Sequence, residues 1–311
     1  MIGSAGAAGA MVLVGSSVAA ASALVDYPIA GGQAFRYGLG AALLFALARG
    51  HLPRITRSQA VRLVALAASG LAGFNAFLIA AVRETDAASV GVIVGCVPVA
   101  LALAGPLLEG RPLSPRVVSA AVVVAAGAAA VQWNGGRMSL LGLALSLGAL
   151  ACEAAFSLLA VPLLRSLGPL AVSTYACLFA APMLLVSGLL LDGAAALPLP
   201  SAEEAAALGY LAAMVTAVGF VLWYSGVERL GVERAGLFAG ILPVSALLSA
   251  AALGVSAITP LRLVGALVVG AGMTAGMKAR GRDLRTDSCA GACRLAGPDP
   301  RSSPRCLKES S

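Results

Sequence analysis

Two charged residues, Glu153 and Arg36, stand inside long apolar stretches of the 311-residue sequence. A charge near the middle of a membrane helix costs about 2.5–3.5 kcal/mol on insertion scales, so such a residue is a candidate for function. Glu153 can accept a proton or pair with a cationic group of a solute; alternatively, a protonated or hydrogen-bonded Glu153 joins two helices. Arg36 can bind an anionic solute, pair with Glu153, or extend with Tyr37 to the membrane surface.

Four further side chains with hydrogen-bonding groups are candidates for the wall of a solute or ion pathway: Ser16, Asn75, Tyr175 and Trp223. Asn75 lies about midway along an uncharged run at 63–82. Trp223 has a second interpretation, because an aromatic residue near the end of an apolar run is typical of an anchor at the membrane surface. Together with the two charged residues, this set predicts solute or ion binding at membrane depth.

Motifs for enzymatic chemistry or metal binding are absent from the sequence. The single histidine, His51, excludes the His-Glu-x-x-His motif of zinc proteases, and no Gly-x4-Gly-Lys-[Ser/Thr] phosphate loop is present. Cys289 and Cys293 are spaced like a metal-binding pair, but no histidine or further nearby cysteine completes four ligands. The net charge of +7 comes from basic residues that stand singly between apolar runs. We therefore predict no enzyme, no metal, no cofactor and no nucleic-acid partner.

The elements that must position these residues are membrane helices. Apolar residues make up 59% of the chain and charged residues 11%, whereas about 25% of a soluble globular chain is charged. A helix needs about 20 mostly apolar residues to cross a bilayer, and the runs here are unbroken, unlike the alternating pattern of barrel strands. We predict ten transmembrane helices, over about 5–25, 30–48, 63–82, 87–108, 117–136, 138–164, 166–191, 205–227, 235–261 and 261–277. A cleaved leader is the alternative for the first, although no Lys or Arg precedes it.

The distribution of Arg and Lys predicts the orientation of these helices, because cytoplasmic loops are enriched in both. With the N-terminus inside, the outer loops contain only Arg83, Arg137 and Arg262, and the inner loops contain the remaining loop arginines. Both termini are therefore predicted to be cytoplasmic, in a multi-pass protein of the cell membrane. The tail 278–311, rich in Pro, Gly, Ser and charge, is predicted to be disordered.

An internal repeat with an offset of 145 residues relates two parts of the sequence, about 82–127 and 227–272. A Gly-x3-Gly-x2-Pro block recurs in both parts, followed by a second proline and a later glycine. The paired residues of the block are Gly91 with Gly236, Gly95 with Gly240, and Pro98 with Pro243. Because five helices are an odd number, a second half of five must cross the membrane in the opposite sense. We predict a first half over 1–136 and an inverted second half over 137–277.

The paired blocks predict interrupted helices near the middle of the membrane. Glycines four positions apart let a neighbouring helix approach closely, and each proline removes a backbone hydrogen bond. Freed carbonyls at this depth are tolerated beside protein or a watery cavity, and matching interruptions in two halves indicate a central binding site. Ordinary helix packing with a tolerated kink is the alternative.

Together these features resemble the drug/metabolite transporter superfamily, EamA-type, over about 5–277. Besides the five-helix halves, the resemblance is carried by short motifs: Gly15-Ser16-Ser17, Arg36-Tyr37, Ala87-Ala88-Ser89, Pro98 and Pro243, and Leu107-Leu108-Glu109 before Arg111-Pro112-Leu113-Ser114. The family often repeats an acidic residue at the end of the penultimate helix. This chain departs from that pattern, because it has Glu109 but Gly254-Val255-Ser256 at the matching place.

The resemblance implies an all-helical polytopic membrane protein that is a secondary transporter, in our interpretation an exporter, of small organic metabolites. Its partners would be a small-molecule solute and the lipid bilayer, and a homodimer is left open. Two other functions also stay open, a channel-like facilitator and a membrane sensor that transports nothing. The inverted repeat favours a transporter, because nothing in the sequence resembles a selectivity filter or a ring of charges.

Overall fold

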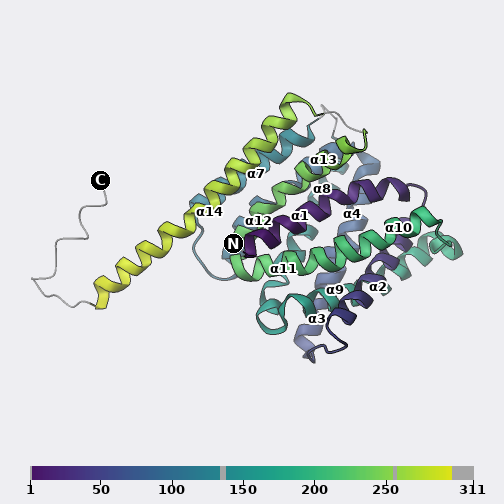
Figure 1. Cartoon of the computed structure of the whole chain (residues 1–311), viewed down its shortest axis with the longest axis horizontal. Coiled ribbons are helices and arrows are strands. Elements are labelled where there is room, and N and C mark those ends of the chain that lie inside the picture. The colour runs from purple at the N-terminus through teal and green to yellow at the C-terminus, as the bar shows by residue number, and fades with distance from the viewer. Residues whose placement is uncertain (1, 134–137, 255–257, 296–311) are drawn as a thin grey trace, which may run out of the picture.

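The computed structural model of the chain describes residues 2–133, 138–254 and 258–295, and the regular structure within these ranges is helical throughout (Figure 1). The first two long helices are α1 (Ile2–Ala21) and α2 (Ile29–Leu47). They are followed by eight helical segments long and apolar enough to cross a membrane: Arg57–Glu84, Ala87–Leu108, Pro115–Gln132, Leu140–Leu158, Val161–Ala196, Ala202–Leu230, Val232–Ala252 and Pro260–Met277. The all-helical class is therefore confirmed, and eight of the predicted spans coincide with helices long and apolar enough to cross a membrane.

Several of these spans are built from shorter helices. The span from Arg57 contains α3 (Arg57–Leu66), a π-helical stretch and α4 (Phe74–Glu84). The next contains α5 (Ala87–Val94) and α6 (Val97–Leu108). In the second part of the chain the composite spans are made of α10 (Ala202–Tyr210), a π-helical stretch and α11 (Gly219–Leu230), and of α12 (Val232–Leu237), a 3-10 turn and α13 (Ile241–Ala252). The single helices are α7 (Pro115–Gln132), α8 (Leu140–Leu158) and α14 (Pro260–Leu295). In contrast, α9 (Val161–Asp192) is broken at Gly168, whose φ of 76° and ψ of 165° are not helical.

Two capping boxes begin the composite spans that contain π-helix. In the first, the Thr56 N–H donates to Gln59 Oε1 at 2.8 Å and the Gln59 N–H donates to Thr56 Oγ1 at 3.3 Å. In the second, the Ser201 N–H donates to Glu204 Oε2 at 2.7 Å and the Glu204 N–H donates to Ser201 Oγ at 3.3 Å. Each box satisfies backbone donors that a helix start leaves without partners. The two caps are 145 positions apart, the offset of the sequence repeat.

The interruptions of the helices follow the same offset. π-Helix occupies Ala67–Gly73 in the first part and Leu211–Val218 in the second, in the same register to within one residue. The break between α5 and α6 falls at Gly95 and Cys96, and the 3-10 turn between α12 and α13 ends at the matching Gly240. π-Helical insertions are uncommon and often lie at functional sites.

Corresponding spans lie side by side in opposite directions. Figure 1 shows α7 along α14. Gly127 of α7 lies against Gly265 of α14 so closely that a Cβ on either would be 2.8 Å from the carbonyl oxygen of the other, and Ala120 lies against Gly276. Because residue numbers rise along one helix as they fall along the other, the pair is antiparallel. The same holds for α2 with α9, and for α6 with α12.

Several boundaries differ from the prediction. The span predicted at 63–82 begins at Arg57, and the span predicted at 235–261 ends at Ala252. The span predicted at 138–164 ends earlier, at Leu158, and α9 begins at Val161 with Pro162 in its first turn, a position that suits proline because its missing N–H has no helical partner there. The described part of the predicted disordered tail is also different, since α14 continues to Leu295. No proline interrupts the sequence between Pro260 and Pro298, so nothing in it forces the helix to end sooner. Residues 296–311 lie outside the described ranges.

Candidate functional site

An aromatic cluster lies in the core where α2, α8 and α11 meet. Tyr37, Phe156, Phe220 and Tyr224 pack with ring centroids 5.0–6.4 Å apart, and all four side chains are buried. The polar atom of Tyr224 is used locally, because its hydroxyl donates to the Phe156 carbonyl at 3.3 Å. The cluster therefore offers ring faces and edges to its neighbours. Of its four residues, only Tyr37 has a hydroxyl that is not used within the cluster.

Trp223 belongs to the same core. Its side chain is 5% exposed, and its Nε1–H donates to Ser157 Oγ at 3.1 Å. The interpretation of Trp223 as an anchor at the membrane surface is therefore wrong. A buried indole needs a partner for its single N–H, and the hydroxyl of Ser157, itself buried, provides one.

Arg36 is held inside the bundle by hydrogen bonds to other polar side chains and not by an ion pair with Glu153. Its Nε donates to Thr216 Oγ1 at 2.7 Å and its Nη1 donates to Gln33 Oε1 at 3.3 Å, and the guanidinium carbon lies 5.3 Å from the centre of the Tyr37 ring. Thr216 belongs to the second π-helical stretch, so this bond joins α2 to an interruption of another span. Tyr37 is 4% exposed, which excludes its extension to the surface beside Arg36.

Three of the predicted residues, Arg36, Asn75 and Glu153, interact with Tyr37. Asn75 is a hydrogen-bonding neighbour of the Tyr37 hydroxyl, and both charged residues act on it electrostatically. Asn75 also donates from Nδ2 to the Leu71 carbonyl at 2.7 Å, within the first π-helical stretch. Glu153 is partly buried and forms no hydrogen bond or ion pair with any residue that the structure describes. We call Arg36, Tyr37, Asn75, Glu153 and Tyr224 the central group.

Ser16 and Tyr175 lie outside the central group. Ser16 Oγ is 2.6 Å from the Tyr210 hydroxyl, just before the second π-helical stretch. Tyr175 donates to the Pro53 carbonyl in the loop before α3 at 2.9 Å and stacks on Phe179. Tyr175 therefore fixes a loop, whereas Ser16 joins two helices of the bundle.

The two glycine blocks both allow close contact but with different neighbours. Gln132 of α7 occupies the space beside Gly91, and its Nε2 donates to the Gly91 carbonyl at 2.8 Å. In the second block, Gly236 lies against Leu101, and Gly240 lies against Val124. The first interruption thus accommodates a polar side chain, and the second an apolar one.

The prolines of the blocks start helices rather than bend them. Pro98 stands in the first turn of α6, directly after the break at Gly95 and Cys96. Pro243 is the third residue of α13, just after the 3-10 turn. Both prolines are buried. In the first turn of a helix a proline has no hydrogen bond to lose, so each proline follows a short turn at which the regular helix is interrupted, although the backbone at Gly95 and Gly240 keeps right-handed helical angles.

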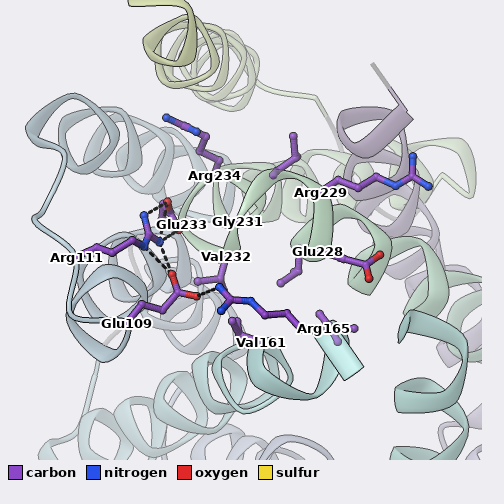
Figure 2. Close-up of a pocket in the computed structure, with 13 residues that line it drawn as sticks. Glu109, Arg111, Val161, Arg165, Glu228, Arg229, Gly231, Val232, Glu233 and Arg234 are labelled. Atoms are coloured by element: carbon purple, nitrogen blue, oxygen red, sulfur yellow. Dashed lines mark hydrogen bonds and ion pairs between the residues drawn. The ribbon is translucent and has the colours of Figure 1, made fainter. Parts of the chain in front are cut away.

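A network of charges lines a pocket of about 310 Å³ at one end of the bundle (Figure 2). Arg111, in the loop after α6, donates from Nε to Glu109 Oε2 at 2.7 Å and from Nη1 and Nη2 to the Glu233 carboxylate at 3.2 Å. Arg165 donates from Nη2 to the other Glu109 oxygen at 3.1 Å. Glu233 is 7% exposed, and its hydrogen bonds raise the pKa of Arg111 above the ordinary value. Bidentate pairs of this kind are strong and directional.

We call this the basic end of the bundle, because Arg229 and Arg234 also line the pocket. A second pocket, of about 250 Å³, lies at the opposite end between the start of α5, the end of α7 and the chain before α8, where Val92 and Gln132 form part of its wall. Sequence reasoning used the arginines of the basic end only for orientation and did not find the network. Its members are separated by up to 124 residues, and no local spacing relates them.

In the described ranges no three His, Cys, Asp or Glu side chains gather as metal ligands. The chemistry that the site offers is therefore that of its own side chains: aromatic surface, one guanidinium, one carboxylate and an amide, at the contact between helices of both parts of the chain.

Comparison with known proteins gives related sequences and a related structure. The model of the EamA-like transporter family matches residues 1–133 and 140–275. The uncharacterized transporter YetK of Bacillus subtilis (strain 168) is 26% identical over 252 residues, covering 78% of this chain and 76% of YetK. The uncharacterized transporter YyaM of the same organism is 23% identical over 245 residues, covering 76% and 80%. A protein of known crystal structure superimposes with a TM-score of 0.74 at 21% identity, covering 88% of this chain and 96% of that one, which shows a shared fold.

Proposed function

The chain belongs to the EamA-like transporter family, and from that premise we propose that it is a secondary transporter that exports a small organic metabolite across the cell membrane by alternating access. The observation that carries the mechanism is the matched set of helix interruptions, 145 residues apart, of which the two at the glycine blocks lie in spans that contact one another through α6 and α12. Interrupted helices in corresponding positions are typical of transporter binding sites, where two halves rock around a bound solute.

Two inverted halves, 1–136 and 137–277, are the second part of the proposal. The antiparallel contacts of α7 with α14 and of α2 with α9 support it, because corresponding helices of inverted halves run in opposite directions. The paired capping boxes and π-helical stretches support it as well. With the basic end facing the cytoplasm, both termini are cytoplasmic, as the arginine distribution favours.

The proposed solute position is beside the central group, with Glu153, Arg36 and Asn75 on the pathway and Trp223 and Ser16 supporting the helices that form it. Two observations favour this place. Glu153 has no ion-pair partner among the described residues, so its carboxylate is available to a proton or a solute. The group also joins α2 and α4 of one proposed half to α8 and α11 of the other, where relative motion of the halves would change its shape.

Binding can be tested before transport is measured. Purified protein is heated in the presence of amino acids, nucleosides, polyols and cationic drugs, because a ligand at 100 times its Kd stabilises the folded state by about 2.7 kcal/mol. We expect at least one solute class to raise the unfolding temperature, and Arg36→Gln to reduce that shift more than Arg62→Gln, which changes an exposed arginine of α3.

Flux into liposomes then separates a carrier from a pore. The solute that stabilises the protein should cross with a saturable rate, since a carrier binds one solute per cycle. Stabilisation that Arg36→Gln leaves unchanged would move the site away from the central group. Flux that rises linearly with concentration would favour the channel-like facilitator, and no stabilising solute with no flux would favour a membrane sensor.

A further inference from the structure

The charge network at the basic end joins the two proposed halves. Glu109 and Arg111 follow α6 in the first half, whereas Arg165 and Glu233 belong to α9 and α12 of the second. Every ion pair between these four residues except Arg111 with Glu109 therefore crosses from one half to the other. Figure 2 shows the Arg111 side chain directed toward both carboxylates at once.

Directly beyond the network, the helices of the two halves are in close contact. A Cβ on Gly105 of α6 would be 2.6 Å from a methyl carbon of Val232 in α12, and one on Gly236 would be 3.0 Å from Leu101. Val232 is 2% exposed and Leu101 is fully buried. Behind the pocket that the network lines, the halves are thus in direct contact at these positions, and Arg111 ties together the two chain segments that form the contact.

At the opposite end, the positions that match three members of the network in the sequence repeat hold uncharged residues. By the offset of 145, Glu109 corresponds to Gly254, Glu233 to Ala88, and Arg111 to Ser256, so none of the three matching positions can ionise. Asp86, a charged residue at that end, is used within its own helix: it accepts hydrogen bonds from the Ser89 Oγ at 2.6 Å and the Ser89 N–H at 3.0 Å, which lower its pKa. At that end the pocket beside Val92 remains between the helices.

From this asymmetry we infer that Glu109, Arg111, Arg165 and Glu233 form a one-sided ionic lock. The lock holds the basic end closed in the resting protein, so the opposite end is the side that is open when no solute is bound. The inference rests on the proposed function, because it assigns the resting state of the alternating-access cycle. The half-exposed Arg111 and the exposed Arg165 keep each bond weak enough to break during a cycle, while bidentate pairing to the buried Glu233 gives the closed state its preference.

Two reporter cysteines can measure the lock without any solute. All six native cysteines are replaced by alanine or serine, and a single cysteine is introduced as Val232→Cys behind the lock or Val92→Cys in the pocket of the opposite end. The rate of reaction with a soluble maleimide is then measured on detergent-purified protein. Arg111→Gln breaks the lock, and Arg62→Gln is the matched control on an exposed arginine.

We expect Arg111→Gln to raise the rate at which the maleimide reacts with Val232→Cys by about tenfold, the factor for one lost charge-assisted hydrogen bond near a surface. The same change should lower the rate of reaction with Val92→Cys. The fall at the distant reporter distinguishes a shift between two states from local loosening. Glu233→Gln should give the same pair of changes, which keeps the test usable if Arg111→Gln does not fold. Arg111→Lys, which keeps the charge but loses the bidentate pair, should give a smaller change.

Three results would overturn the lock: no change at either reporter, a rise at Val232→Cys with no fall at Val92→Cys, or equal changes with Arg62→Gln. None of these rates depends on transport. If the lock responds as expected while liposomes show no flux of any solute, the resting state is correct and the transport proposal fails.

Discussion

Arg36 shows how a charged side chain is kept inside an apolar helix bundle. Its guanidinium donates hydrogen bonds to Thr216 and Gln33 and lies near the face of the Tyr37 ring. These interactions offset much of the free-energy cost of removing the charge from water. Glu153 has no such partners among the described residues, although it lies in the same region. Of the two buried charges, Glu153 is therefore the one that is free to change its protonation state.

Charge and polarity within apolar runs were sufficient to identify Arg36, Asn75 and Glu153, which the structure brings together. The tyrosines that complete the central group, Tyr37 and Tyr224, and the Thr216 partner of Arg36 were not predicted as such. A membrane helix is apolar on all sides, so its sequence does not reveal which face is turned inward, and only the packing of neighbouring helices decides that. The same limitation explains the wrong surface interpretation of Trp223.

We predict that Glu153→Gln removes the pH dependence of transport. Glutamine keeps the size and the hydrogen-bonding capacity of the side chain but cannot take up and release a proton. The measurement is solute flux into liposomes between pH 5.5 and 8.5, with Glu84→Gln, at the exposed end of α4, as the control. Flux with the pH profile of the parent would leave Glu153 as a residue that joins helices.

At the scale of elements, hydrophobicity and charge placed the spans, and repeated glycines and prolines placed the interruptions. The nature of the interruptions was not predictable: Pro98 begins a new helix instead of bending one, and the π-helical stretches have no proline or charge to mark them. A π-helical turn adds one residue to the helix, and whether the chain accepts it depends on partners such as Asn75 in the same span and Arg36 in another span.

The first glycine block gives a test at this scale. Gly91→Ala should reduce the free energy of unfolding by about 0.5–1.5 kcal/mol, because the added Cβ would displace the Gln132 side chain and break its hydrogen bond to the Gly91 carbonyl. Gly91→Ala combined with Gln132→Ala should lose less than the sum of the two single changes, since the second makes room for the first. Thermal unfolding in detergent measures both.

Gly209→Ala is the control for this pair, because no atom lies near the position of its Cβ and alanine favours a helix over glycine. It should leave stability unchanged or slightly raised. Additive losses for Gly91 and Gln132 would show that the two residues do not share the space that the structure assigns to them.

For the whole molecule, orientation is the first prediction. A cysteine introduced as Ser311→Cys should not react with a membrane-impermeant maleimide in intact cells, whereas Leu199→Cys, in the exposed loop before α10, should react. Both are made in a background without the native cysteines. External labelling at position 311 would place the basic end outside and reverse the direction in which the lock closes.

The most direct test of alternating access by two inverted halves is counterflow. Liposomes that contain the purified protein are loaded with an unlabelled solute that stabilises it and are then diluted into a trace of the same solute carrying a label. A carrier that exposes its site to one side at a time should accumulate the label transiently above its external concentration, because outward movement of unlabelled solute returns the site to the outer face. Entry of label only to its equilibrium level, at a rate independent of the preloaded solute, would contradict alternating access.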